Sequence, residues 1–183
     1  MCIPKTISRR SDLVFRPIFL LAASAIAVPA QASLGLDAPV LTDGFRALEG
    51  EWQCDGHFIS SGKPLSSKIS FRADARTAAL IVRHDDRPPG QYHALEVWTA
   101  GNPRQGFRAT LVDAFSGTRW FQSPGWDGAT LVWTRYDNGK PAEQFAYEIV
   151  KPGRLKIDWS VSRENGPMVL GDTLDCARSA PGP

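Results

Sequence analysis

From Glu51 onward, apolar and polar residues alternate with a period of two over short segments. Such alternation predicts β-strands with one buried and one solvated face. Gly, Pro, Asn and Asp separate the segments, and Asp137-Asn138-Gly139-Lys140 predicts a tight hairpin because Asn-Gly readily adopts positive φ angles. About ten strands without helical spacers predict an all-β antiparallel barrel or sandwich, and we expect the barrel. The predicted strands cover residues 51–58, 67–72, 78–84, 91–99, 106–113, 117–122, 130–136, 144–150, 155–161 and 167–176.

A short helix is predicted immediately before the first strand, over residues 42–48. Thr42 or Asp43 can cap its N-terminus, and Gly50 can end it. The sequence shows no other convincing helix. The expected organisation is therefore an extended arm, a single β-barrel domain and a frayed tail, at residues 33–41, 42–178 and 179–183 respectively.

The first 32 residues have the three-part pattern of a secretory signal peptide. A basic segment ends at Arg16, an uncharged apolar run of eleven residues spans 18–28, and Ala30-Gln31-Ala32 offers a cleavage site. The run is too short to cross a bilayer, so no transmembrane segment is expected after signal removal. We expect a periplasmic or secreted protein. Ser8-Arg9-Arg10 resembles a twin-arginine signal, which leaves two export routes open.

The signal segment accounts for the basic balance of the whole chain. The chain has 21 Lys and Arg residues against 19 Asp and Glu residues. Four of the basic residues and one acidic residue lie in the first 32 positions, which leaves 17 basic and 18 acidic residues among the remaining 151. A net charge of −1 gives no electrostatic case for a nucleic acid partner.

Two cysteines, Cys54 and Cys176, remain after signal removal. In an oxidising compartment, two cysteines near opposite ends of a domain usually pair. The alternative is two unrelated buried thiols. A disulfide that closes so long a loop would stabilise the fold by about 4–5 kcal/mol in the chain-entropy model.

The start of the first strand carries a motif with a family resemblance. Gly50-Glu51-Trp52 follows the short helix and opens a meander of strands that ends near Cys176. This order resembles calycin-like bacterial proteins, a group related to lipocalins and fatty-acid-binding proteins. The resemblance implies a barrel around a pocket, with Trp52 plugging the base and Arg178 packing over it. It leaves the activity open, because one fold hosts many functions.

Aromatic residues and a few charged residues on apolar strand faces are the candidate ligand contacts. An inward charged residue must be paired or must bind a polar ligand end, because unpaired burial is costly. An inward Arg that receives a carboxylate is the device used for fatty acids. The alternative is that the aromatic residues fill the core and the charged residues face solvent. The residues predicted to contact a small apolar or amphipathic ligand are Tyr92, Glu96, Trp98, Arg108, Trp120, Trp133 and Tyr147.

Metal or cofactor chemistry has little support in the sequence. His57, His84 and His93 lie on three different predicted strands, and histidines scattered in this way are more often surface residues than metal ligands. Haem-binding nitrobindin-type barrels resemble this chain at their Gly-x-Trp start, but their proximal His lies near the C-terminus, and no His follows His93 here. The cluster His84-Asp85-Asp86-Arg87 could orient a catalytic base, although a strand end is the simpler interpretation. We expect no metal and no cofactor.

Three functions fit these patterns. The first is an exported binding protein for a small, partly apolar ligand, which requires a cavity in the barrel. The second is an acid–base enzyme, which requires Glu96 or His93 to meet an Arg in one cavity. The third is a structural or protein-interaction module, which requires an exposed apolar patch around Trp120 and Trp126.

Overall fold

The computed structural model describes residues 41–101, 106–164 and 166–180. The predicted signal segment, nearly all of the predicted arm and the last residues of the predicted tail lie outside these ranges. One helix, α1 (Asp43–Leu48), precedes the strands. The strands are β1 (Gly50–Phe58), β2 (Pro64–Asp74), β3 (Ala79–Asp86), β4 (His93–Ala100), β5 (Phe107–Asp113), β6 (Gly117–Ser123), β7 (Trp126–Asp127), β8 (Thr130–Asp137), β9 (Lys140–Lys151), β10 (Arg154–Ser162) and β11 (Met168–Arg178).

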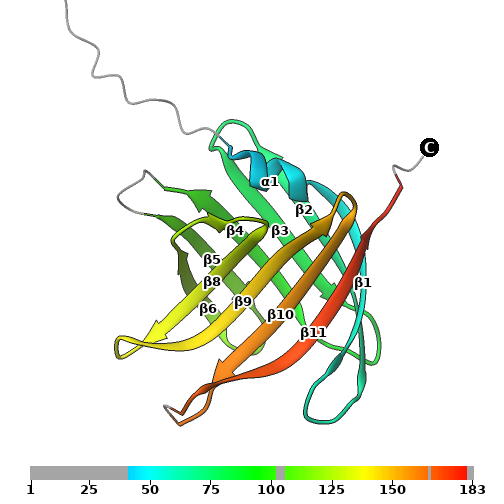
Figure 1. Cartoon of the computed structure of the whole chain (residues 1–183), viewed down its shortest axis with the longest axis vertical. Coiled ribbons are helices and arrows are strands. Elements are labelled where there is room, and N and C mark those ends of the chain that lie inside the picture. Colours follow the sequence, from blue (N-terminus) through cyan, green and yellow to red (C-terminus); the bar gives the residue numbers. More distant parts are fainter. Residues whose placement is uncertain (1–40, 102–105, 165, 181–183) are drawn as a thin grey trace, which may run out of the picture. The chain divides into compact units, whose positions relative to one another are not determined.

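Ten of these strands close into an antiparallel barrel (Figure 1). From β1 to β6 and from β8 to β11, each strand pairs with the next along the chain, and β1 pairs with β11. The ring closes between β6 and β8, where Gln122 is the partner of Thr134. The two-residue β7 pairs only with β8. The predicted all-β antiparallel barrel of about ten strands with a short N-terminal helix is therefore confirmed.

Several strands extend further than the apolar pattern predicts, and two of these extensions, in β3 and β9, carry residues of the candidate site. β3 runs to Asp86, which pairs with Ser67 of β2, and β9 begins at Lys140, which pairs with Asp137 of β8. The added residues are largely polar, so alternation of apolar residues could not reveal them. Backbone pairing with a neighbouring strand holds them in the sheet, and the same extensions carry Asp86 and Glu143, which are important below.

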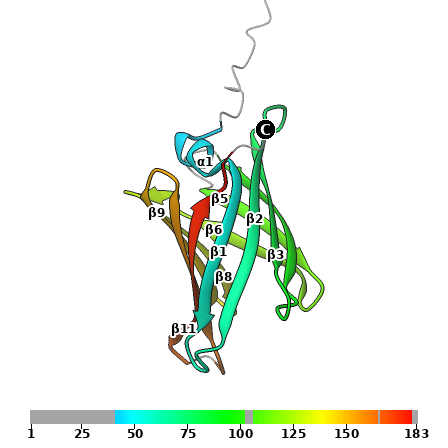
Figure 2. The ribbon, with the colours of Figure 1, turned by 90° about the vertical axis from the view of Figure 1, so that its right-hand side faces the viewer.

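The helix α1 lies at the end of the barrel where β1 begins (Figure 2). The Thr42 side chain caps it by accepting a hydrogen bond from the backbone N–H of Phe45, at 3.3 Å. Phe45 is fully buried, and its ring lies 5.2 Å from that of Phe107 and 6.0 Å from that of Trp98. The apolar face of α1 therefore contributes to the core at this end.

The contact implied by the lipocalin resemblance is present at this end. Trp52 is buried and donates a hydrogen bond from its indole N–H to the Leu48 carbonyl, at 2.8 Å. The guanidinium carbon of Arg178, the last residue of β11, lies 4.6 Å from the centre of the Trp52 ring. Arg178 also donates hydrogen bonds to the carbonyls of Ala47 and Glu49, so one side chain joins β11, the C-terminal end of α1 and Trp52.

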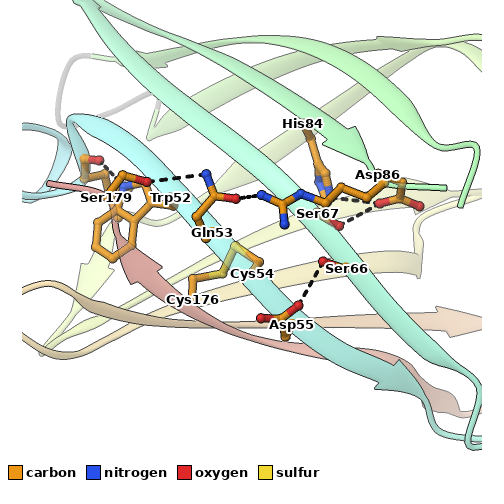
Figure 3. Close-up of a disulfide and its surroundings, with 12 residues drawn as sticks. Trp52, Gln53, Cys54, Asp55, Ser66, Ser67, His84, Asp86, Cys176 and Ser179 are labelled. Atoms are coloured by element: carbon orange, nitrogen blue, oxygen red, sulfur yellow. Dashed lines mark hydrogen bonds and ion pairs between the residues drawn. A yellow bond between two sulfur atoms is a disulfide. The ribbon is translucent and has the colours of Figure 1, made fainter. Parts of the chain in front are cut away.

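Cys54 and Cys176 form a disulfide between β1 and β11 (Figure 3). The two residues are direct partners in the β1–β11 ladder and lie 122 positions apart in sequence. The alternative of two separate thiols is therefore excluded. The disulfide ties the first strand of the barrel to the last.

The interior of the barrel changes in character along its axis. The half next to α1 is filled by buried aromatic side chains, with the Trp98 ring 5.1 Å from Trp133 and 4.8 Å from Tyr147. The other half carries ionisable groups on its inner face. The barrel is therefore a packed core at one end and a candidate site at the other.

Candidate functional site

A cavity of about 250 Å³ lies in the half of the barrel away from α1. Its position follows from the strand directions, because its lining residues cluster where β1, β3 and β5 end and where β4, β6, β9 and β11 begin. The apolar part of its wall is formed by Phe58, Leu65, Phe115, Phe145, Ile157, Trp159 and Leu174. The polar part is formed by His84, Asp86, Tyr92, Asp113, Ser116, Arg119, Glu143 and Asp172.

Arg119 is the centre of an ion-pair network in the cavity wall. Its guanidinium group pairs with the carboxylates of Asp113 on β5 and Glu143 on β9. Glu143 also binds Arg135 through an N–O distance of 3.1 Å and accepts a hydrogen bond from the Trp159 indole N–H at 3.0 Å. Both carboxylates are almost fully buried, and such groups are stable inside a protein only when paired. The network therefore neutralises Arg119 from two sides.

The ionisation of this network follows from its contacts. Burial would lower the pKa of Arg119, but the hydrogen bond and charge of Glu143 outweigh burial and raise the pKa. Burial would raise the pKa of Asp113, but the backbone N–H groups of Ser116 and Phe115, together with Arg119, lower it below the ordinary aspartate value. Arg119 and Asp113 are thus both charged at neutral pH.

His84 and Asp86 form a second polar group, on the inner face at the end of β3 (Figure 3). The Nε2 atom of His84 lies 3.5 Å from Oδ1 of Asp86, and the Ser67 hydroxyl donates a hydrogen bond to the same oxygen at 2.7 Å. Burial would raise the pKa of Asp86, but the contacts with His84 and Ser67 outweigh it and lower the pKa. Asp86 is therefore a carboxylate at neutral pH.

Asp172, on β11, is the carboxylate of the cavity wall with the fewest stabilising contacts. Burial, with the charges of Asp86 and Asp158, raises its pKa to about 6 against the opposing effect of His84. Among the residues that the structure describes, none donates a hydrogen bond to this carboxylate. It is consequently ionised at neutral pH at a cost in free energy, which is a common property of functional sites.

Glu96 is buried inside the barrel on the rung that joins Leu111 to Arg119. It accepts a hydrogen bond from the Trp98 indole N–H at 2.7 Å. Burial raises the pKa of Glu96 despite that hydrogen bond, so the neutral acid is favoured. Burial and the nearby Glu96 likewise raise the pKa of Tyr92 and of Tyr147, and both phenols stay protonated.

The predicted ligand contacts fall into three groups. Tyr92 lines the cavity. Glu96, Trp98, Trp133 and Tyr147 lie inside the barrel but belong to the buried core and not to the cavity wall. Arg108 and Trp120 lie on the outer wall, where Arg108 contacts Gln122 and Trp120 is 69% exposed.

Comparison with known proteins adds no identification. No protein-family model matches this chain, and no curated protein matches it. The closed ten-stranded barrel is consistent with a calycin-like fold. The function must therefore be argued from the cavity itself.

Two polar residues of the cavity wall were not among the predicted ligand contacts, although a pattern in the sequence marks their positions. Arg119 shares the inward face of β6 with Phe121, and Asp172 shares that of β11 with Leu174. A charged residue in phase with buried apolar neighbours marks such a position. Glu143 had no comparable signal, because it precedes the predicted start of its strand.

The remaining histidines do not join the cavity. His57 and His93 are exposed, and Nδ1 of His93 lies 2.9 Å from Asp85 on the outside of the barrel. Within the described ranges, no group of three or more His, Cys, Asp or Glu residues is arranged to hold a metal ion.

The helix α1, the one helix among the described residues, is too short to span a membrane.

The outer wall carries an apolar patch across β4, β5 and β6. It consists of Leu95, Val97, Val112 and Trp120, all exposed, and Leu95 is the ladder partner of Val112. Trp126 does not join this patch, because it is half-buried and packs against Gly44 of α1. The predicted grouping of Trp120 with Trp126 is therefore not present.

Proposed function

We propose that this protein is an exported, calycin-like binding protein that holds a small, partly apolar molecule in the cavity away from α1. The observation that carries the proposal is the cavity of about 250 Å³ with an aromatic and a charged wall. Protein interiors are close-packed and contain few voids larger than a water molecule. This volume lies just below the ~300–1,000 Å³ typical of ligand pockets, so a compact ligand is expected.

Unsatisfied polar atoms in the cavity wall support binding of a molecule there. Nε2 of His84 and Nε of Arg119 are buried without a hydrogen-bond partner in the described part of the chain. Buried polar atoms are normally paired, so a ligand or water in the cavity would complete both groups.

Export is supported by the signal-like first 32 residues together with the disulfide. A structural disulfide between Cys54 and Cys176 suits the periplasm or the cell exterior, where thiols are oxidised. The two observations are independent, since one comes from the N-terminal sequence and the other from the pairing of β1 with β11.

A screen of small aromatic fragments by ligand-observed NMR tests the proposal. Ser116→Trp places a large side chain in the cavity wall, in the exposed turn between β5 and β6. Ala75→Trp is the matched control, because it lies in the exposed turn between β2 and β3 at the α1 end. Fragments should bind the wild-type protein and Ala75→Trp but not Ser116→Trp. Absence of binding to the wild-type protein, or equal binding by Ser116→Trp, would contradict a binding cavity.

Acid–base catalysis in the same cavity is the second candidate. It is favoured by the juxtaposition of His84, Asp86 and Asp172, the last of which has a pKa of about 6. The predicted meeting of Glu96 or His93 with an Arg in the cavity does not support it. His93 lies outside the barrel, and Glu96 belongs to the buried core and not to the cavity wall. NMR spectra of each bound fragment over time would detect conversion, and conversion that persists in His84→Ala and in Asp172→Asn would contradict this role.

A further inference from the structure

We propose that the molecule held in the cavity is an organic cation, an ammonium group attached to an apolar body. This inference rests on the proposed binding function and specifies the class of ligand. The proposed ligand has the opposite charge to that of fatty-acid-binding proteins, in which an inward Arg receives the carboxylate of the ligand.

The charge of the cavity wall argues against an anionic ligand. Four carboxylates line the cavity, from Asp86, Asp113, Glu143 and Asp172, against the single guanidinium of Arg119. Arg119 is already paired with two of these carboxylates. Even with a protonated His84 and with the Arg135 that pairs with Glu143, negative charges outnumber positive ones. An incoming carboxylate would meet net repulsion, and the guanidinium among the described lining residues is already paired.

One rung of the barrel places a carboxylate among aromatic side chains. In the β1–β11 ladder Asp172 is the partner of Phe58, and in the β10–β11 ladder it is the partner of Trp159. Trp159 is in turn the partner of Phe145 on β9. Ladder partners point to the same face, and all four residues line the cavity. Phe58, Asp172, Trp159 and Phe145 therefore form a continuous row across four strands.

Such a row has the composition of a site for an organic cation. Ammonium groups bind over aromatic faces, most strongly over Trp, and aromatic cages recognise quaternary ammonium ligands. The Trp159 ring is fixed in place because its N–H is hydrogen-bonded to Glu143. The adjacent Asp172 carboxylate has no hydrogen-bond donor among the described residues, so its charge is available to a ligand.

On the same side of the cavity, His84 places a buried polar atom that has no hydrogen-bond partner among the described residues. The residue is 9% exposed, it lines the cavity, and its Nε2 atom has no hydrogen-bond partner within the described ranges. Ionised carboxylates are acceptors only. Asp86 and Asp172 thus present acceptors, which suits the N–H donors of an ammonium group.

Three probes of matched shape and different charge test this inference. We choose 2-phenylethylammonium, 2-phenylethanol and phenylacetate, with affinities measured by titration calorimetry at neutral pH. The cation should bind at least about tenfold more tightly than the alcohol, and the anion should bind most weakly. Equal binding of cation and alcohol, or preference for phenylacetate, would overturn the inference and leave the binding function standing. Failure of all three to bind would also overturn it, and the fragment screen with Ser116→Trp then decides the binding function separately.

The variant Asp172→Asn tests whether the charge of Asp172 contributes to binding of the cation. It should weaken binding of 2-phenylethylammonium by about tenfold or more and change binding of 2-phenylethanol by less than about twofold. Asp175→Asn is the matched control, because Asp175 lies on the same strand with its side chain exposed. Cation binding that is unaffected by Asp172→Asn, or reduced equally by Asp175→Asn, would overturn the assignment. Circular dichroism establishes that both variants are folded.

Discussion

Asp172→Asn should make the protein more stable at neutral pH, although it removes a charge from the proposed site. The pKa of Asp172 is about 6, against 3.8 for an ordinary aspartate, chiefly because the carboxyl group is buried. Each pKa unit corresponds to about 1.4 kcal/mol. Ionised Asp172 therefore costs up to about 3 kcal/mol of folding free energy, and an uncharged amide avoids that cost.

The sign of the effect fixes its pH dependence. The carboxyl group of Asp172 has a higher pKa in the folded than in the unfolded chain, so the folded state binds the proton more tightly. The cost is complete above about pH 7, decreases as pH falls through 6, and disappears below the unfolded pKa near 3.8. The stabilisation by Asp172→Asn should follow the same course.

Urea unfolding, followed by circular dichroism at about pH 8 and about pH 3, measures this prediction. The free energy of unfolding of Asp172→Asn should exceed that of the wild-type protein by about 1–3 kcal/mol at the higher pH and match it at the lower pH. Asp175→Asn should match the wild-type protein at both. A destabilised Asp172→Asn at about pH 8, or a gain that is equal at the two pH values, would refute the reasoning.

Two further predictions concern the end of the barrel near α1 and the joining of its first and last strands. Reducing the Cys54–Cys176 disulfide should lower the free energy of unfolding by about 4–5 kcal/mol, because it closes a loop of 122 residues. Urea unfolding with and without reductant measures this loss, and a change below about 1 kcal/mol would contradict it. Arg178→Ala should cost about 2 kcal/mol, because it removes the contact with Trp52 and hydrogen bonds to Ala47 and Glu49. Arg154→Ala, at an exposed position on β10, is the control, and an equal loss in both variants would argue against a specific role for Arg178.

The fold could be predicted because alternation of apolar residues reports directly which face of a strand is buried. Ala94, Glu96 and Trp98 share one parity on β4, and all three are buried. The Asn138-Gly139 turn could be predicted for a similarly local reason, since both residues adopt positive φ in the structure. Alternation and turn motifs depend only on residues close together in the sequence, so they can be interpreted without knowing which strands pair.

The site could be predicted only in part. Alternation along a strand shows which side chains point into the barrel, but it does not show at which level along the barrel axis each of them lies. Tyr92, the residue just before β4, has the same parity as Trp98 on β4, yet Tyr92 lines the cavity and Trp98 lies in the filled half. The difference arises from what the other nine strands place at each level. Near α1, the helix supplies Phe45, β8 supplies Trp133 and β9 supplies Tyr147, and their rings pack against Trp98 and leave no space.

The sequence by itself determined the strands, the short helix, the turns and the two cysteines available for pairing, because each is set by residues close together in the chain. Only the tertiary structure decided that Arg119 is neutralised by Asp113 and Glu143, and that Phe58, Asp172, Trp159 and Phe145 form one row. These groupings depend on the register between strands that are distant in sequence. A shift of one residue would turn each of these side chains to the opposite face of the sheet. The charge and shape of the cavity are therefore properties of the closed barrel and not of any single strand.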